Sequence, residues 1–569
     1  MKKLQFHFAA AICGASLLAG GSALGAASTY TVDGNGDAAV TSGDGYCLSA
    51  EDSERLYRNI TLYSGLTIDG ESCGGLTNSQ SVTIGPWLSS PQPAIVTITN
   101  GVRWVTGRSK TINFKRKGGT IVVSEPSART WTWGAGDKVA TALSADTYPN
   151  MIGTIGWLSP FAIQDDVEAE GGTMDMLRLL PNGTASFQYI TNGNASVAAR
   201  ILFEGGELVS IHDQATKFRT GAGGKIVLQS VDSMPIVLRT SSYDYSLFSG
   251  EGTLETAGAG DFILLQHNSN TKTVTLGADN GNIVWGHTGD FLLGGRMCLK
   301  LASDDVLPHG EGKGKVVFYV NNKMYSGIAT STDKPVIFDL NGKSATVNAL
   351  VQGTGDAAYY SKWHVVTNSS ETIATLGLDV YADENLHIIM TTNLAANAVL
   401  NIRLKKVGSG KLTINNDKAT NILERVAGTE IADGVCYFYQ SYALTRPLVV
   451  TGGGSIQVRD VGGKTLDLSA IPDADLSIGG LTVEANPESN PTITKLRPSE
   501  NGKLYLTNVT GGLESNYIVP ITLSTVVDAG NFASWKVYVN GVESRGLVPS
   551  FANGVLKIRP KFGTIIIVR

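Results

Sequence analysis

The sequence predicts an all-β protein, a right-handed parallel β-helix with a small antiparallel segment at its C-terminal end. Three observations lead to this fold. The chain has 67 Gly among its 569 residues, only 17 % of its residues are charged, and short segments of alternating polar and apolar residues recur after glycine turns. Long helical patterns are almost absent. Such a chain favours many short strands joined by tight reversals. Tandem β-sandwiches are the alternative, because frequent turn signals suit them too.

The first 25 residues have the features of a secretory signal peptide. Lys2 and Lys3 give a positive start, residues 4–19 are largely apolar, and the small residues Ala23 and Gly25 precede a cleavage point. We therefore expect an exported protein, at the cell surface or outside the cell. A membrane anchor is the alternative, but the apolar run is short, and we expect no transmembrane span in the mature chain.

Three further regions follow the signal peptide. Residues 26–115 are expected to form a capping region and the first coils, beginning with a short helix around residues 49–59, where Ser49 and Asp52 have capping-box spacing. Residues 116–515 are expected to form the solenoid. Residues 516–569 are expected to form the antiparallel segment, because Asn540-Gly541 is a strong hairpin signal.

The solenoid is indicated by a motif of a glycine turn followed by a short strand. The clearest copies are GGTIVV (118–123), GGKIVL (223–228), GSGKLTI (408–414), GGGSIQV (452–458) and NGKLYL (501–506). Their spacing is irregular, so the repeat has no strict period. Coils of roughly 20–25 residues, about 4.8 Å apart, would stack about 400 residues into a rod on the order of 80 Å long.

GSGKLTI and GGGSIQV resemble the autotransporter-associated β-strand repeat, and residues 43–68 resemble the entry segment of secreted β-helix proteins. In that segment Gly-Asp-Gly and a Cys lead into a short capping helix and a first coil. The resemblance implies a right-handed parallel β-helix of the passenger-domain type. It also implies a bacterial protein on the cell surface or outer membrane, with an adhesin-like role.

Charge and cysteine content narrow the possible partners. The net charge is −5, and loss of Lys2 and Lys3 with the signal peptide makes it −7, which argues against nucleic acid. Glycans or cell-surface components are the partners expected instead.

Cys47 and Cys73 are the candidate disulfide pair in an oxidising compartment, and no CxxC spacing points to zinc.

A candidate calcium loop lies near the mature N-terminus. Asp33, Asn35, Asp37 and Asp44 fall at ligand positions of such a loop. Ala38 stands where the sharp turn needs Gly, so the sequence favours a solvated turn. No cofactor is therefore expected, with calcium as the alternative.

Two acidic stretches are the candidates for catalysis. Asp165 with Asp166, and Asp304 with Asp305 and His309 as a base, would be the groups that cleave a glycosidic bond if neighbouring coils brought them together. Adjacent carboxylates of one strand point to opposite faces. The sequence favours solvated loops, so no catalytic site is assigned and enzymatic activity stays open.

Trp131 and Trp133 are the candidate glycan-binding residues, because they share a face if TWTW is a strand. Burial in the core is the alternative for both rings.

Together these features predict an exported structural or adhesin-like protein that displays loops on a rigid β-rod for weak multivalent contacts. A β-helix polysaccharide lyase or glycoside hydrolase is one alternative, and a non-catalytic glycan-binding protein is the other.

Overall fold

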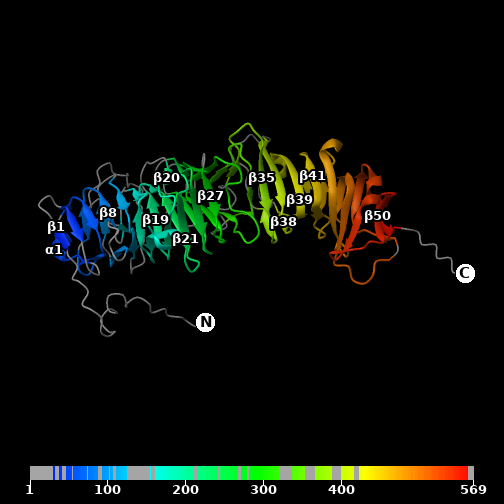
Figure 1. Ribbon diagram of the computed structural model, residues 1–569. Helices are drawn as coiled ribbons and strands as arrows, with labels where there is room; N and C mark the ends of the chain where they lie inside the picture. The colour runs from blue at the N-terminus through cyan, green and yellow to red at the C-terminus, as the bar shows by residue number, and fades with distance from the viewer. Residues whose placement is uncertain are drawn as a thin grey trace. The chain divides into compact units, whose positions relative to one another are not determined.

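The structure of the protein is a computed structural model. It describes residues 30–32, 37–40, 46–53, 56–73, 75–86, 93–100, 103–106, 110–124, 154–155, 160–210, 216–240, 244–266, 271–277, 281–295, 297–319, 336–352, 365–386, 399–415, 422–514 and 516–561. Most of these residues are in strands, which pair in parallel to form a β-solenoid of about 12 turns (Figure 1). The predicted β-helix is confirmed, and the tandem sandwiches are excluded because their sheets would be antiparallel.

The chain divides into two compact units. Unit 1 comprises residues 1–268, 278–288 and 322–329, and unit 2 comprises residues 269–277, 289–321 and 330–569.

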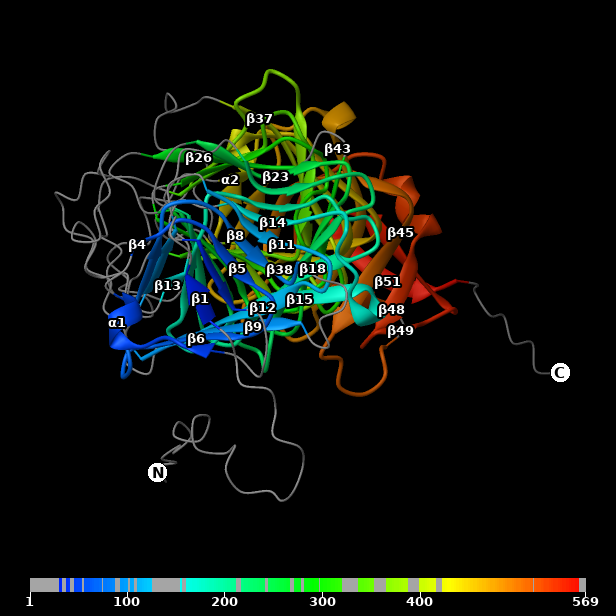
Figure 2. The same ribbon diagram turned by 60° about the vertical axis from the view of Figure 1, so that its left-hand side comes forward.

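Each coil of unit 1 contributes one strand to each of three sheets, called A, B and C here. Figure 2 shows strands of sheet B side by side. Sheet A contains β1 Tyr30–Val32, β2 Ala38–Val40, β5 Ile60–Leu62, β8 Val82–Ile84, β11 Ile112–Phe114, β14 Phe161–Ile163, β17 Ile190–Asn192, β20 Thr216–Thr220 and β23 Tyr245–Gly250. Sheet B contains β3 Tyr46–Cys47, β6 Leu66–Asp69, β9 Ala94–Thr99, β12 Gly119–Val123, β15 Thr173–Leu179, β18 Ala198–Phe203, β21 Lys225–Ser230, β24 Thr253–Ala257 and β27 Asn282–Trp285. Sheet C contains β4 Leu56–Tyr57, β7 Leu76–Asn78, β10 Arg103–Thr106, β13 Thr154–Ile155, β16 Thr184–Ser186, β19 Glu207–Ser210, β22 Ile236–Thr240 and β25 Phe262–Gln266.

The core of unit 1 is built from columns of apolar side chains. Parallel neighbours keep the same face of each strand inward, so equivalent residues of successive coils stack on one another. One column of sheet A consists of Ile112, Phe161, Ile190, Phe218 and Phe248. Each of these side chains is at most 1 % exposed. The glycine-and-strand pattern therefore yields a continuous stack.

The number of residues in a coil varies although the columns stay in register. Ile60 pairs with Val82, 22 residues on, whereas Phe218 pairs with Phe248, 30 residues on. The loops between strands absorb the difference, which is why the motif has no fixed period in the sequence.

Sheet C is buried on both of its faces. Leu238 and Leu264 point into the core, and the next residues, Arg239 and Leu265, point outward. The outward side chains of Arg239 and Leu265 are nevertheless only 1 % exposed. Arg239 Nη2 lies 2.9 Å from Glu207 Oε2, so the buried cation has a charged partner. Burial on both faces explains why strands such as FILLQ lack polar alternation.

The first coil is closed by β1, which pairs antiparallel with β2. Helix α1 (Ala50–Ser53) follows β3 and has the predicted capping box. Ser49 N donates to Asp52 Oδ2 at 2.9 Å, and Asp52 N donates to Ser49 Oγ at 3.4 Å. The prediction of a helix up to residue 59 is wrong, because residues 56–57 already pair in sheet C.

Unit 2 contains two short parallel ladders and three further sheets. The ladders are β26 Lys272–Leu276, β29 Met297–Leu301, β31 Ile337–Asp339 and β34 Val365–Thr367, and β28 Phe291–Gly295, β30 Val316–Tyr319 and β33 Leu350–Gln352. Sheet D contains β32 Ala345–Val347, β35 Ala374–Asp379, β37 Leu400–Val407, β39 Val426–Phe438, β41 Leu448–Val458, β43 Leu476–Glu484, β45 Pro498–Thr507, β48 Lys536–Val539 and β49 Val542–Glu543, with β36 Glu384–Leu386 and β38 Lys411–Ile414 beside β39. Sheet E contains β40 Tyr442–Ala443, β42 Thr465–Asp467, β44 Thr492–Leu496 and β47 Thr522–Val526. Sheet F contains β46 Tyr517–Ile518, β51 Val555–Pro560 and β50 Leu547–Ala552. The short helices are α2 Ile422–Arg425, η2 Glu170–Gly172 (in unit 1), η4 Asp473–Asp475 and η5 Ala529–Ser534.

The long strands of sheet D bend partway along their length. The register between β39 and β41 shifts after Ile431, and that between β43 and β45 shifts after Ile478. Such bulges let one strand continue round a corner of the coil. The second halves of these strands then form a regular ladder of their own.

The C-terminal end of unit 2 contains the predicted antiparallel hairpins, but β47 and β48 within residues 516–569 still pair in parallel with β44 and β45. Strands β48 and β49 form a hairpin in which Asn540 and Gly541 have φ values of 48° and 83°, which fits a type I′ turn. Strands β50 and β51 form a second hairpin. Trp535 is 2 % exposed beside this end, and its Nε1 donates to the Ser499 carbonyl at 2.7 Å.

Candidate functional site

The carboxylates of the first acidic stretch belong to a turn after β14. Asp165 and Asp166 are both exposed. Asp166 Oδ2 lies 3.9 Å from Arg116 Nε, and the Asp165 carbonyl accepts a hydrogen bond from Asn194 Nδ2. These are contacts between neighbouring turns of unit 1.

The second acidic stretch forms a turn after β29 in unit 2. Asp304 Oδ1 accepts a hydrogen bond from Ser344 N at 2.7 Å, and Asp305 Oδ1 accepts one from Thr346 Oγ1 at 3.2 Å. His309 is exposed. The hydrogen bonds of the two aspartates link one coil to the next. Among the described residues, neither aspartate has a partner that would support catalysis.

Of the candidate calcium ligands, only Asp37 lies within the described residues. Its Oδ1 accepts hydrogen bonds from Asn59 N at 3.1 Å and from Asn59 Nδ2 at 3.0 Å. Asp33, Asn35 and Asp44 lie outside the described residues. Over the ranges that the structure covers, no three His, Cys, Asp or Glu side chains form a group that could hold a metal ion.

Cys47 and Cys73 lie on adjacent turns near the first coil. Both thiols are free in the structure, with Cys47 exposed and Cys73 buried. Cys47 Sγ is 3.5 Å from Oγ of Ser72, the residue before Cys73. The disulfide between Cys47 and Cys73 therefore stays a prediction.

Export into an oxidising compartment is expected to join these two thiols. Thiol titration of the denatured exported chain should then find only Cys298 and Cys436, and the Cys73→Ser variant should make Cys47 titratable as well. Four free thiols in the exported wild-type chain would contradict the pairing.

The candidate glycan-binding residues Trp131 and Trp133 lie outside the described residues. Trp104 is within them, and it is 1 % exposed in the core of unit 1. Its Nε1 donates to Asn78 Oδ1 at 2.9 Å. The Trp104 ring therefore packs in the core and is not exposed to a ligand.

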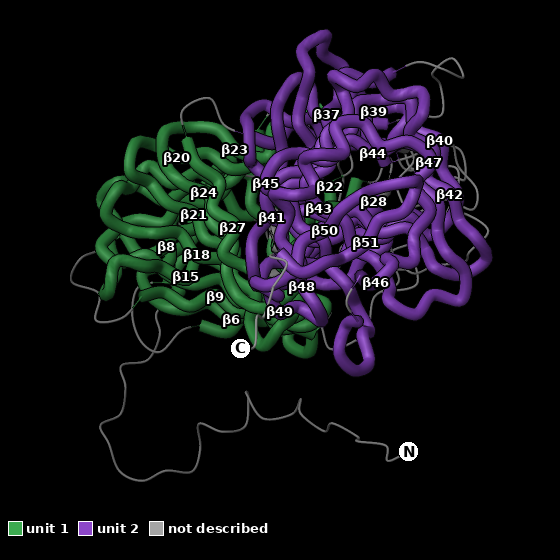
Figure 3. The backbone as a smooth tube through the Cα atoms, turned by 90° about the vertical axis from the view of Figure 1, so that its right-hand side faces the viewer, with its two compact units in different colours: residues 1–268, 278–288, 322–329 green, residues 269–277, 289–321, 330–569 purple. Residues whose placement is uncertain are grey.

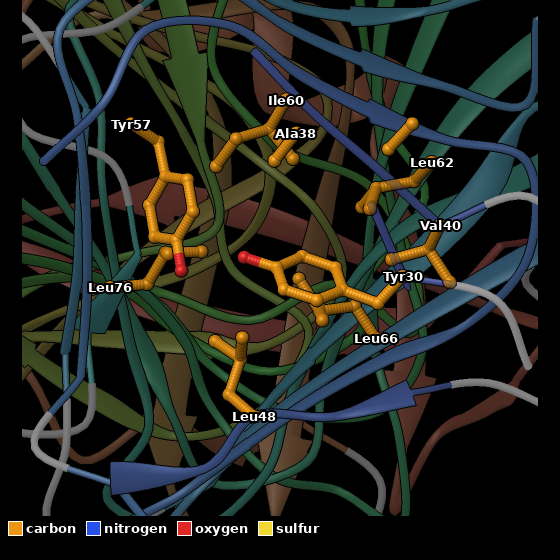
Figure 4. A pocket seen from close by; sticks show the side chains of 10 residues that line it. Tyr30, Ala38, Val40, Leu48, Tyr57, Ile60, Leu62, Leu66 and Leu76 are labelled. Carbon is orange, nitrogen blue, oxygen red and sulfur yellow. The ribbon is translucent and has the colours of Figure 1, made fainter. Parts of the chain in front are cut away.

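A small cavity lies inside the first coils of unit 1 (Figure 4). It is lined by apolar side chains together with Tyr30 and Tyr57, and its volume is about 10 Å³, roughly the room that one water needs. Burial raises the pKa of Tyr30, with a further contribution from the neighbouring Tyr57. The cavity is too small for an organic ligand.

The outward side of sheet D offers a different kind of surface. The second halves of β39, β41, β43 and β45 pair in that order, and β45 in turn pairs with β48. All five strands belong to unit 2, which is purple in Figure 3. Their inward residues, such as Ile456 and Leu504, are fully buried, so the residues between them point outward. The register aligns a central outward column of Tyr437, Gln457, Thr482, Tyr505 and Tyr538. Flanking positions carry Lys411, Ser455, Lys503 and Lys536 on one side, and Tyr439, Arg459, Glu484 and Thr507 on the other. We call these residues the tyrosine face.

The rings of the tyrosine face are held by contacts between neighbouring strands. The Tyr505 and Tyr538 rings stack with centroids 5.0 Å apart and an interplanar angle of 29°. The Arg459 guanidinium carbon lies 3.9 Å from the centroid of the Tyr439 ring. Strand spacing of about 4.8 Å brings such rings and cations into contact, so the solenoid itself sets their positions.

The polar groups of the tyrosine face are partly engaged and partly available. The Ser455 and Thr482 hydroxyls are 2.8 Å apart, and Thr507 Oγ1 donates to Glu484 Oε2 at 3.0 Å. The half-exposed side chains of Gln457 and Lys503 make no hydrogen bond within the part of the chain that the structure describes. Ring surface beside available hydrogen-bonding groups is characteristic of a binding surface.

Burial changes the acid–base behaviour of the face only modestly. It raises the pKa of Tyr437 and of Tyr505, in the second case with a further contribution from Tyr538. Both phenols therefore stay protonated at neutral pH and can donate hydrogen bonds.

Lys406 in β37 is a buried cation near the bend of sheet D. It is 1 % exposed, and its Nζ donates to the carbonyls of Gly408 at 2.7 Å and Asp433 at 2.8 Å. Burial lowers the pKa of Lys406 to about 8, and burial raises the pKa of the nearby Cys436 thiol to about 12. The lysine closes a corner of the coil and is not accessible to a ligand.

The free energy of unfolding of unit 2 is expected to depend on pH because the charge of Lys406 is buried. Its folded pKa of about 8 lies below the ordinary 10.5, so the cost of burying the charge is fully present below pH 8 and is relieved as the pH rises toward 10.5. Relative to the Lys406→Met variant, the free energy of unfolding should rise by about 3 kcal/mol between about pH 7.5 and 10.5. Urea unfolding of both proteins across this range measures it, and a difference independent of pH would contradict it.

Comparison with family models, with curated proteins and with solved structures gave no match. In the described part of the chain, the structure contains no helix with the length and apolar character needed to cross a membrane.

Proposed function

We propose that the chain is an exported structural and adhesive protein that acts at the cell surface or outside the cell. The tyrosine face is the observation that carries this proposal. Its tyrosine rings are half-exposed and lie beside polar side chains, a combination that is enriched where proteins bind their partners.

The parallel coils provide the scaffold that such a role needs. Each outward residue lies about 4.8 Å from its counterpart on the next coil, so weak contacts repeat in a row. Contacts made by several rows at once add through effective concentration, and each can be weak. Export is supported by the sequence features of residues 1–25, with Lys2 and Lys3 before an apolar run.

Location and adhesion can be tested with the full chain expressed in a bacterial host. The wild-type chain should be found in the envelope or medium with a new N-terminus near Ala26, and external protease should degrade it on intact cells. The Leu17→Arg/Leu18→Arg variant, whose apolar run is broken, should stay in the cytoplasm.

Cells that produce the wild-type chain should also adhere to one another or to a matrix-coated surface better than cells that produce the double variant. A wild-type chain that remains in the cytoplasm, or that is exported without any change in adhesion, would refute the proposed function.

A further inference from the structure

We propose that the tyrosine face binds an extended, uncharged polysaccharide. This proposal rests on the proposed function, and it names the partner that the adhesive surface recognises. It also moves glycan recognition from the tryptophan pair of the sequence prediction to the tyrosines of sheet D.

The first argument is the ring surface that Tyr505 leaves open. Tyr538, on the next strand in one direction, stacks on one side of the Tyr505 ring. The strand in the other direction carries Thr482 opposite Tyr505, and Thr482 is only 6 % exposed, so neighbouring side chains cover it. Tyr505 and Tyr538 are themselves half-exposed, and the exposed part of their rings is available to pack on the C–H face of a sugar.

The second argument is the set of polar groups beside that ring. Gln457 follows Thr482 in the central column, about two strand spacings or roughly 10 Å from Tyr505. Its amide and the Lys503 ammonium group make no hydrogen bond among the described residues. A ring flanked by an amide and an ammonium group matches the hydroxyl-rich edge of a pyranose.

The third argument is charge. The positive charges of the face are those of Lys411, Arg459, Lys503 and Lys536. Negative charges balance them, because Glu484 belongs to the face and two of the lysines form ion pairs. Glu543 Oε2 is 3.3 Å from Lys536 Nζ, and Asp383 Oδ2 is 2.9 Å from Lys411 Nζ. The face thus carries both signs, so it has no strong field to attract an acidic polymer. An uncharged polymer suits it better.

The fourth argument is size. From β38, which carries Lys411, to β48 the face spans five strand spacings, about 24 Å, and its three columns span roughly 13 Å along the strands. An area on the order of 300 Å² is well below the 800 Å² or so that each partner of a stable protein complex contributes. A narrow, extended polymer fits this area better than a second copy of the chain.

Affinity electrophoresis tests the proposal with residues 26–569 of the exported protein. Native gels would contain hydroxyethyl cellulose, galactomannan or alginate, the last being the acidic polymer. The wild-type protein should be retarded by at least one of the two uncharged polymers and not by alginate. The Tyr505→Ala variant should bind about tenfold more weakly, as expected for loss of one aromatic contact.

The matched control is Tyr189→Ala in unit 1. Tyr189 is half-exposed like Tyr505, and its ring also packs against a neighbouring side chain, with the ring centroid 4.0 Å from Cζ of Arg219, but it is outside the tyrosine face. This variant should be retarded like the wild type. If Tyr505→Ala loses its cooperative thermal transition, Gln457→Ala replaces it, because Gln457 is half-exposed and its loss leaves the core intact.

Several results would overturn the proposal. These are equal retardation of the wild type and the face variants, retardation by alginate alone, no retardation by any polymer, and a dimer that Tyr505→Ala abolishes. In each case an exported and adhesive wild-type chain would leave the proposed function standing. A cytoplasmic chain would instead remove the proposed function, whatever the gels show.

Discussion

Replacing Phe218 with Ala is expected to destabilise the middle coils of unit 1 by about 3–5 kcal/mol. Phe218 is fully buried between Ile190 and Phe248 of its column, and its ring centroid is 5.8 Å from that of Phe187. The hydrogen-bonded sheets around this column are rigid, so the coil cannot collapse to fill the cavity.

Native-state hydrogen exchange measures this loss where it occurs. Amides of β17, β20 and β23 should exchange faster in Phe218→Ala, and the change converts to a local free energy of opening. Arg219→Ala, which alters the adjacent outward residue, is the control and should leave their exchange within about 1 kcal/mol of the wild type. Unchanged protection in Phe218→Ala would mean that the column does not support these coils.

Replacing Trp535 with Ala is expected to open the C-terminal end of unit 2, also at a cost of about 3–5 kcal/mol. The Trp535 ring packs against Phe532 with centroids 4.9 Å apart, and its Nε1 bonds to the Ser499 carbonyl. A Cβ on Gly502 would lie 2.3 Å from the Trp535 ring, so the indole fills the space that this glycine leaves.

The effect of Trp535→Ala should stay near the end of the unit. In a solenoid each coil contacts only its neighbours, so amides of β45 and β48 should lose protection while those of β37 keep it. Trp535→Phe retains a ring but loses the N–H donor. It should therefore destabilise unit 2 less than Trp535→Ala does, with about 1 kcal/mol of its effect due to the lost hydrogen bond. Uniform loss of protection through unit 2 would contradict this local role.

The sequence is sufficient to predict the solenoid because its signals are local. A glycine turn and a period-two strand are each visible within seven residues, and Asn540-Gly541 marks its hairpin within two. The helix near Ser49 is predicted too long because its capping box fixes only the start. Its end is set by pairing of Leu56–Tyr57 with β7, which is a tertiary contact.

The tyrosine face could not be predicted in the same way. Tyr437, Tyr505 and Tyr538 each occupy an outward position of a short strand, and this alternation is visible in the sequence. Their alignment depends on the register between coils of unequal length, which no local pattern encodes. Trp131 and Trp133 are predicted as a glycan-binding pair because their spacing of two residues is visible in the sequence, but they lie outside the described residues.

The unequal coils of unit 1 also bear on how such a protein changes over generations. Twenty-two residues separate Ile60 from Val82, and 30 separate Phe218 from Phe248, yet both pairs are neighbours in the same sheet. Insertions and deletions at the corners can therefore accumulate without disturbing the stacked side chains, since longer loops add little entropic cost. Selection can vary what the corners present to the surroundings while the scaffold is inherited unchanged. The same separation makes these corners suitable positions for grafting foreign peptides.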